Sequence, residues 1–284
     1  MTTSDPTPPR VAVVIVNWRN APMTLQAVAR VFGQSRAPEH VFVVDNASDD
    51  GSVKALRTGL AAWPGRATLI VNDRNKGFGG GCNPAIAAAL AGGYAYIWLL
   101  NNDALPDGDC LAALVRVAES AIGPVGAVGS LLSDPEGAAP PHFGSWMRPR
   151  ALTCGNVAEQ RDLEHHYAWC TAASLLLAAD AIRQVGAFDE GFFMYWEDAD
   201  LNMRLRAAGY ALLCAPKARV AHHAGTSSAS LPVQRYLWHF DSQRLFLARN
   251  HHSPASATLW LRAKFLLKAL YDRDFPRLRA LLAR

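Results

Sequence analysis

The stretch Val11-Ala12-Val13-Val14-Ile15-Val16 is a continuous, mostly β-branched apolar run that ends in the polar segment Asn17-Trp18-Arg19-Asn20. Such a run is typical of a parallel strand that is buried on both faces. Three similar apolar runs follow at 41–44, 68–71 and 96–100, with segments of helical character between them. Strands that alternate with helices predict a doubly wound α/β sheet.

Polar residues follow each of these strands. Ligands of such sheets bind at the carboxyl ends of the strands, where this chain places Asn17, Asp45, a glycine-rich segment after Asn72, and Asn101-Asn102-Asp103. The carboxylate of Asp45 is suited to accept hydrogen bonds from a nucleobase or a ribose, although the segment 45–52 is equally consistent with a plain turn and helix cap.

The segment Lys76-Gly77-Phe78-Gly79-Gly80-Gly81-Cys82-Asn83 begins like the dinucleotide-binding fingerprint GxGxxG, but Cys82 occupies the third glycine position. The segment also follows the third strand rather than the first, which argues against a nicotinamide or flavin dehydrogenase. No GxxxxGK[ST] sequence occurs, which excludes the P-loop NTPases. We expect a flexible loop that contacts a nucleotide sugar, followed by a helix over 84–91.

Two further polar clusters are candidates for a metal site. The apolar strand 96–100 ends in 101–103, whose carboxylate and amide oxygens are ligands that Mg²⁺ and Mn²⁺ prefer. A simple turn is the alternative, favoured by Pro106-Asp107-Gly108. The pair His222-His223 follows a predicted edge strand, and its place after the acidic helix described next raises the chance that it binds metal.

An aromatic segment leads directly into three carboxylates at 188–201. Phe192 to Trp196 are bulky, and Glu197, Asp198 and Asp200 follow at the start of a helix that we expect to end at Gly209. Acidic residues commonly cap helices. Capping does not account for the aromatic residues, and the alternative is a general base beside an apolar pocket.

Composition limits the possible classes. The 284 residues are 50% hydrophobic and carry a formal net charge of +4, which allows one large domain with or without an appendage. The five cysteines form no CxxC pair, so neither a disulfide framework nor a zinc site is predicted, and a reducing cytoplasm is expected. Residues 1–10 are polar and proline-rich, and are expected to be disordered. No apolar run is long enough to span a membrane.

The tail from 229 to 284 is expected to be helical, with a break at Ser253-Pro254. Its last part, 251–284, carries seven Lys and Arg residues against two Asp, together with apolar triplets at 259–261 and 265–267. A basic amphipathic helix binds anionic membrane interfaces, or it packs on the catalytic domain with a solvated basic face. Nucleic-acid binding is not favoured, because few aromatic residues are interleaved with the charges.

In combination, these motifs resemble glycosyltransferase family 2, which contains inverting enzymes of the GT-A fold, and in particular its bacterial rhamnosyltransferase branch of cell-surface polysaccharide synthesis. The matching segments are Val14–Trp18, Val43–Ser52, Asn75–Asn83, Leu99–Asp103, Phe188–Leu201 and His222–Ser227. They span Val11 to about Ser228. The resemblance therefore implies a GT-A domain over 11–228 and a C-terminal helical, basic amphipathic extension over 229–284.

The resemblance also implies roles for individual residues. Asp198 would be the catalytic base, with Trp196 and Glu197 on the acceptor side. Asp103, His222 and Asn101 would hold Mn²⁺ or Mg²⁺, although the strongest metal binders of the family have a carboxylate where this chain has Asn101. The nucleotide-sugar contacts would be Asn17, Asp45, Asn75, Gly77, Asn83 and Asn102.

The substrates that the resemblance implies are a nucleotide-sugar donor and a glycan or polyprenyl-linked acceptor. The first choice of donor is dTDP-L-rhamnose, followed by a UDP-hexose or UDP-galactofuranose. A cytoplasmic enzyme in peripheral contact with the inner face of the plasma membrane is expected. The alternatives are a nucleotidyltransferase, for which Asn17-Trp18-Arg19-Asn20 is a poor phosphate loop, and an inactive nucleotide-sugar-binding scaffold.

Overall fold

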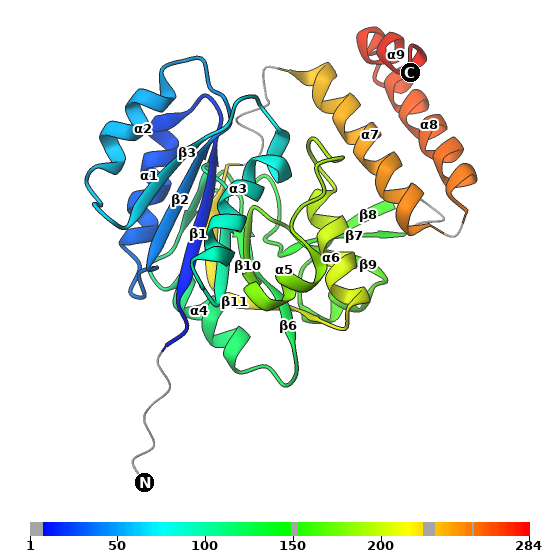
Figure 1. Cartoon of the computed structure of the whole chain (residues 1–284). Helices are drawn as coiled ribbons and strands as arrows, with labels where there is room; N and C mark the ends of the chain where they lie inside the picture. Colours follow the sequence, from blue (N-terminus) through cyan, green and yellow to red (C-terminus); the bar gives the residue numbers. More distant parts are fainter. Residues whose placement is uncertain (1–7, 149–152, 224–230, 252) are drawn as a thin grey trace.

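A computed structural model describes residues 8–148, 153–223, 231–251 and 253–284 (Figure 1). Its centre is an eight-stranded sheet with the strand order β3-β2-β1-β4-β10-β6-β11-β5. The strands of this sheet are β1 (Val11–Asn17), β2 (His40–Asp45), β3 (Ala67–Val71), β4 (Tyr96–Leu100), β5 (Ala104–Pro106), β6 (Val125–Ser133), β10 (Ser174–Ala178) and β11 (Ala211–His222). The four strands expected at the N-terminal end are all present.

The sheet is mixed, with parallel pairing in the majority. β3, β2, β1 and β4 pair in parallel, and β11 is parallel to β6. β10 runs antiparallel between β4 and β6, and the short β5 is antiparallel to β11 at the edge. The predicted α/β architecture with a mostly parallel sheet is confirmed.

Helices cover both faces of the sheet because side chains alternate along each buried strand. In β1, Val11, Val13 and Ile15 pack with one group of helices, and Ala12 and Val14 pack with the other. The first group is α1 (Ala21–Phe32), α2 (Ser52–Leu60) and α4 (Cys110–Glu119), and the second is α3 (Gly77–Ala91), α5 (Ala179–Val185) and α6 (Glu197–Ala207).

The glycine-rich segment is not the flexible loop that we expected. It forms the first turns of α3, which begins at Gly77 rather than at Pro84. A Cβ atom on Gly77 would lie 1.7 Å from the carbonyl oxygen of Phe193, and one on Gly79 would lie 2.8 Å from the Cβ of Phe188. The glycines therefore let α3 pack closely against the segment that carries the acidic residues.

Two strand predictions were wrong in their boundaries. The strand expected over 169–177 is two strands, β9 (Tyr167–Cys170) and β10, and β9 belongs to a separate sheet with β7 (Gly144–Arg148) and β8 (Thr153–Val157). The two edge strands expected at 210–215 and 219–223 are the single strand β11. This strand is not at the edge of the sheet, because it lies between β6 and the edge strand β5. A register shift between Ala215 and Arg219 accommodates Pro216, which has no N–H group to donate.

The C-terminal extension is helical, as predicted, and consists of α7 (Pro232–Asn250), α8 (Pro254–Tyr271) and α9 (Phe275–Leu282). It packs on the rest of the protein through an apolar cluster in which Phe246, Leu261 and Phe265 join Trp169 and Trp196. Figure 1 shows α7 lying between α8 and α6, the helix that begins with the acidic residues. One face of the extension therefore packs on the catalytic domain, as one of the two alternatives for the tail predicted.

The opposite face of α8 keeps large apolar side chains in solvent. Leu259 and Trp260 are each 70% exposed and Leu267 is 65% exposed. Within the described ranges, no helix has the length and apolar character needed to cross a membrane. Residues 1–7 of the predicted N-terminal lead and the predicted boundary at 228/229 lie outside the described residues.

Candidate active site

A cavity of about 480 Å³ opens at the carboxyl ends of β1, β2 and β4. This volume falls in the range of small-molecule sites. Its wall also includes the start of α3, the turn Thr171–Ala173 between β9 and β10, the segment Met194–Asp198 and two residues of α7. The position predicted for ligand binding is therefore where the structure has its cavity.

One corner of the cavity brings together three of the predicted site residues. The pairing of β5 with β11 places Ala104 opposite His222, so that His222 Nε2 lies 3.2 Å from Asp103 Oδ1 and 3.2 Å from Asn101 Nδ2. His142 also lines the cavity, and its Nδ1 is buried with no hydrogen-bond partner among the described residues. His142 was not among the predicted site residues, and it follows an Ala- and Pro-rich stretch with no periodicity.

This corner offers a suitable but incomplete set of ligands for a divalent cation. Asn101 Oδ1 is buried and has no hydrogen-bond partner in the described part of the chain. The carboxylate of Asp103 and the amide oxygen of Asn101 are ligands of the kind that Mn²⁺ and Mg²⁺ prefer, and the imidazole of His222 adds one nitrogen ligand. The described residues contain no cluster of three or more His, Cys, Asp or Glu side chains that could hold a metal ion. Such an ion would therefore need further oxygen ligands from a substrate diphosphate or from water.

Asn46, which follows β2, organises the side of the cavity formed by Asn75 and the start of α3. Its Nδ2 donates to Asn75 Oδ1 and to the carbonyl of Gly77, and its Oδ1 accepts from Lys76 N. Asn75, Gly77 and Asn102 line the cavity together with Asn46 itself, which the sequence analysis did not single out.

Three predicted donor contacts do not line the cavity. Asp45 is fully buried and accepts hydrogen bonds from Asn17 Nδ2 (2.8 Å) and from Ser48 N (2.9 Å). Asn83 donates to the carbonyl of Phe188. Asn17, Asp45 and Asn83 are held by hydrogen bonds within the protein, and their assignment as direct donor contacts stays a prediction.

The two acidic residues at the start of α6 have different environments. Asp198 accepts hydrogen bonds from Ala199 N (2.8 Å) and Ala172 N (3.2 Å), which hold its carboxylate in one orientation at the cavity wall. Glu197 is 6% exposed, and its Oε2 has no partner within the described residues. Burial, together with the neighbouring charge of Asp198, raises the pKa of Glu197 to about 8, and burial also raises the pKa of Asp198.

The backbone in front of the acidic pair is strained. Tyr195 and Trp196 have φ angles of 70° and 68°, in the left-handed region that bulky residues rarely adopt. Each such residue costs about 1–3 kcal/mol and is typical of functional sites. Ring contacts of Trp196 with Trp169 (5.2 Å) and Phe246 (5.1 Å) hold this conformation in place.

The glycosyl transferase family 2 model matches residues 12–177, more than half of the chain. The chain belongs to glycosyltransferase family 2. The match covers the chain from β1 to β10, and the enzyme class expected from the motifs is confirmed.

Known proteins resemble this glycosyltransferase over most of its length. An N-acetylglucosaminyl-diphospho-decaprenol L-rhamnosyltransferase from Mycobacterium tuberculosis is 29% identical over 263 residues, which cover 84% of each chain. A galactofuranosyltransferase, GlfT1, from Mycolicibacterium smegmatis is 29% identical over 221 residues, covering 76% of this chain and 72% of the relative.

A solved structure supports the fold. The mannosyltransferase PcManGT from Pyrobaculum calidifontis, in complex with GDP-Man and Mn²⁺, aligns with a TM-score of 0.62 at 20% identity. The alignment covers 98% of this chain and 75% of that one. The predicted GT-A architecture is confirmed by this likeness.

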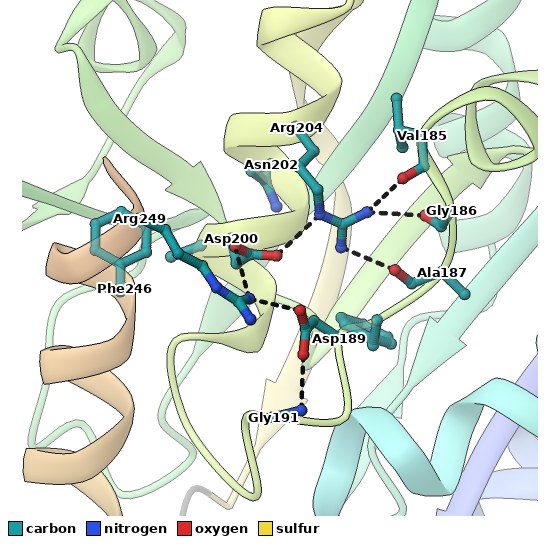
Figure 2. A network of polar contacts seen from close by, with 12 residues as sticks. Val185, Gly186, Ala187, Asp189, Gly191, Asp200, Asn202, Arg204, Phe246 and Arg249 are labelled. Atoms are coloured by element: carbon teal, nitrogen blue, oxygen red, sulfur yellow. Dashed lines mark hydrogen bonds and ion pairs between the residues drawn. The ribbon is translucent and has the colours of Figure 1, made fainter. Parts of the chain in front are cut away.

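A network of hydrogen bonds and ion pairs connects α6, the helix that begins with Glu197 and Asp198, to α7 (Figure 2). Arg249 of α7 contacts Asp189 (2.6 Å) and Asp200 (3.6 Å), and its guanidinium lies over the ring of Phe192. Arg204 donates to Asp200 (2.9 Å) and to the three backbone carbonyls of 185–187. The network joins both ends of the 185–200 segment, so α7 helps to position the acidic pair.

The raised pKa of Glu197 predicts a pH-dependent stability. A carboxyl group whose folded pKa lies above its unfolded value stabilises the fold at low pH, and that contribution is lost as pH rises from about 4.5 to about 8. Glu197→Gln cannot ionise, so its stability relative to the wild type is expected to increase across this interval, by on the order of 1–4 kcal/mol. Thermal unfolding of both proteins at pH 5 and pH 9 measures the change; a constant difference between them would contradict it.

Proposed function

We propose that the enzyme transfers a sugar, with inversion, from a nucleoside-diphosphate sugar to a hydroxyl group of a lipid-diphosphate-linked or glycan acceptor in cell-surface polysaccharide synthesis. The main support for this proposal is that one cavity is lined both by the hydrogen-bonded carboxylate of Asp198 and by the corner formed by Asn101, Asp103 and His222. dTDP-L-rhamnose is the first choice of donor, supported by the rhamnosyltransferase relative. UDP-galactofuranose is the second, supported by the similarity to GlfT1.

In the proposed mechanism Asp198 is the general base. It takes the proton of the acceptor hydroxyl while that oxygen forms a bond to the anomeric carbon and the bond from this carbon to the diphosphate oxygen breaks. The N–H groups of Ala172 and Ala199 orient the carboxylate, and the aromatic residues before it exclude water. The amide N–H groups and dipole at the start of α6 favour its ionised form.

The leaving diphosphate would lie at the corner of Asn101, Asp103 and His222. A Mn²⁺ or Mg²⁺ ion held there would supply positive charge to the departing oxygens. The imidazoles of His222 and His142 line the same part of the wall and are suited to hydrogen-bond the diphosphate.

The donor is tested with a panel of nucleotide sugars, each with and without Mn²⁺, in thermal-shift and transfer assays. A bound donor raises the melting temperature by mass action. We expect the largest shift and measurable transfer with dTDP-L-rhamnose. A larger response to UDP-galactofuranose would favour the second candidate, whereas no response to any donor or acceptor would favour the nucleotide-sugar-binding scaffold.

The exposed face of α8 is expected to place the enzyme at an anionic membrane, on the cytoplasmic side where lipid-linked acceptors would be glycosylated. Trp260 and Leu267 project into solvent on a helix that also carries Arg262 and Lys268. The double substitution Trp260→Ser/Leu267→Ser is expected to reduce flotation with phosphatidylglycerol vesicles about tenfold or more. Ile122→Ser, which removes an exposed apolar side chain outside the extension, is the control. Equal flotation of the double variant and the wild type would rule out this contact.

A further inference from the structure

Helix α7 contributes two polar side chains to the wall of the cavity. Arg235 and His239 both line it, although they belong to the C-terminal extension rather than to the sheet. They are four residues apart and therefore lie on the same face of the helix. Neither residue was among the site residues predicted from the sequence.

Arg235 brings a positive charge into a cavity whose other charged groups are mostly acidic. It is the one Lys or Arg among the cavity-lining residues in the described part of the chain, where the carboxylates are Asp103, Glu197 and Asp198. Between the described residues, no carboxylate forms an ion pair with Arg235. A guanidinium group at a cavity wall without an acidic partner is suited to bind an anionic ligand group.

The imidazole of His239 supplies an N–H donor on the same face of α7 as Arg235. The indole N–H of Trp196 can only donate, and it lies 3.2 Å from His239 Nδ1. Nδ1 must therefore accept, which leaves the proton of the neutral imidazole on Nε2. Stacking on Tyr195, at 5.0 Å between ring centroids, holds the ring in this orientation.

These contacts place the pair on the acceptor side. His239 touches Tyr195 and Trp196, the two residues immediately before the acidic pair, and the general base faces the acceptor hydroxyl. The donor diphosphate is assigned to Asn101, Asp103 and His222, which belong to other elements. α7 also packs on α8, whose exposed apolar face is the proposed membrane contact.

We propose that Arg235 and His239 form an anion-binding subsite for the diphosphate of a lipid-linked acceptor. This inference rests on the proposed function. Arg235 pairs with phosphate oxygens, and His239 Nε2–H donates to the same group, so that the acceptor sugar beyond the diphosphate is directed towards Asp198. The subsite would give a function to the part of the C-terminal extension, on α7, that forms part of the cavity wall.

The test compares two soluble acceptors in the full-length enzyme: N-acetylglucosamine linked through a diphosphate to a short prenyl chain, and octyl N-acetylglucosaminide, which has no phosphate. The wild type is expected to prefer the diphosphate acceptor in kcat/KM. Arg235→Gln is expected to reduce that preference about 10- to 100-fold, the value of one or two charge-assisted hydrogen bonds. Arg244→Gln, which removes an exposed charge of α7 outside the cavity, should keep the preference.

Other outcomes overturn the assignment. If Arg235→Gln keeps the wild-type preference, Arg235 does not read the acceptor diphosphate. If it instead raises the KM for the donor and affects both acceptors equally, the diphosphate that it binds is that of the donor.

A second measurement does not depend on transfer. Calorimetric binding of inorganic pyrophosphate in the presence of EDTA is expected for the wild type and for Arg244→Gln, and to be at least tenfold weaker for Arg235→Gln and His239→Phe. Wild-type binding with no transfer to either acceptor would contradict the proposed function but keep the anion subsite. Equal affinities of the wild type and Arg235→Gln would overturn the subsite itself.

Discussion

Replacing Asp198 with Asn is expected to lower kcat about 10²- to 10⁴-fold, the contribution typical of a positioned general base. Asn has nearly the same shape, and its amide oxygen can still accept from Ala172 N or Ala199 N, which hold the native carboxylate. What it cannot do is take a proton from the acceptor hydroxyl. Fold and donor binding should therefore survive while the chemical step fails.

Initial rates under saturating donor and acceptor measure the loss of turnover, and the thermal shift produced by the donor measures binding. Asp180→Asn, an exposed carboxylate at the start of α5, is the matched control and should retain wild-type activity. An Asp198→Asn variant with near wild-type turnover would remove Asp198 from the role of base and direct attention to Glu197.

Replacing Asp103 with Asn is expected to lower turnover on the order of 10²–10³-fold and to weaken the response to Mn²⁺. Among the residues that the structure describes, Asp103 is the one carboxylate at the corner where His222 and Asn101 meet, and it is 5% exposed. Without its charge, the corner retains only neutral ligands for a divalent cation. The departing diphosphate would then lose its main source of positive charge.

Mn²⁺ titrations of activity, together with the thermal shift caused by nucleoside diphosphate with and without Mn²⁺, separate metal binding from chemistry. Asp107→Asn, an exposed carboxylate four residues further along the chain, is the control. An unchanged Mn²⁺ dependence in Asp103→Asn would show that any divalent ion is held elsewhere.

Much of the fold and part of the candidate site could be predicted from local patterns. The apolar runs that form β1, β2 and β4 are continuous because helices cover both faces of these strands, so burial makes them recognisable, whereas β3 is only partly buried and was recognisable from its β-branched composition. The polar residues after these strands lie at one edge because parallel strands end together. The acidic pair at the start of α6 was recognisable because aromatic residues precede it, which a simple helix cap does not require.

The errors came from segments whose conformation depends on distant partners. The glycines of 77–81 are helical because the segment around Phe188 and Phe193 packs against them, a contact across more than one hundred residues. The two edge strands expected at 210–215 and 219–223 are one strand, because a register shift between Ala215 and Arg219 keeps β11 continuous against β6. Asp45 is buried and held by Asn17 and Ser48, so its assignment as a donor contact stays a prediction.

The sequence by itself determined the class of fold, the enzyme family and the acidic pair, since these depend on hydrophobic pattern and on short motifs of fixed spacing. Only the tertiary structure decided which side chains share the cavity. His142 lies before β7, and Arg235 and His239 lie on α7, so these residues come from two places in the chain that are distant from Asp198, and no local pattern marks them. Arg235 and His239 reach the cavity because the apolar faces of α7 and of the segment around Trp196 are buried against each other, and this long-range packing places the polar side chains of α7 at the cavity wall.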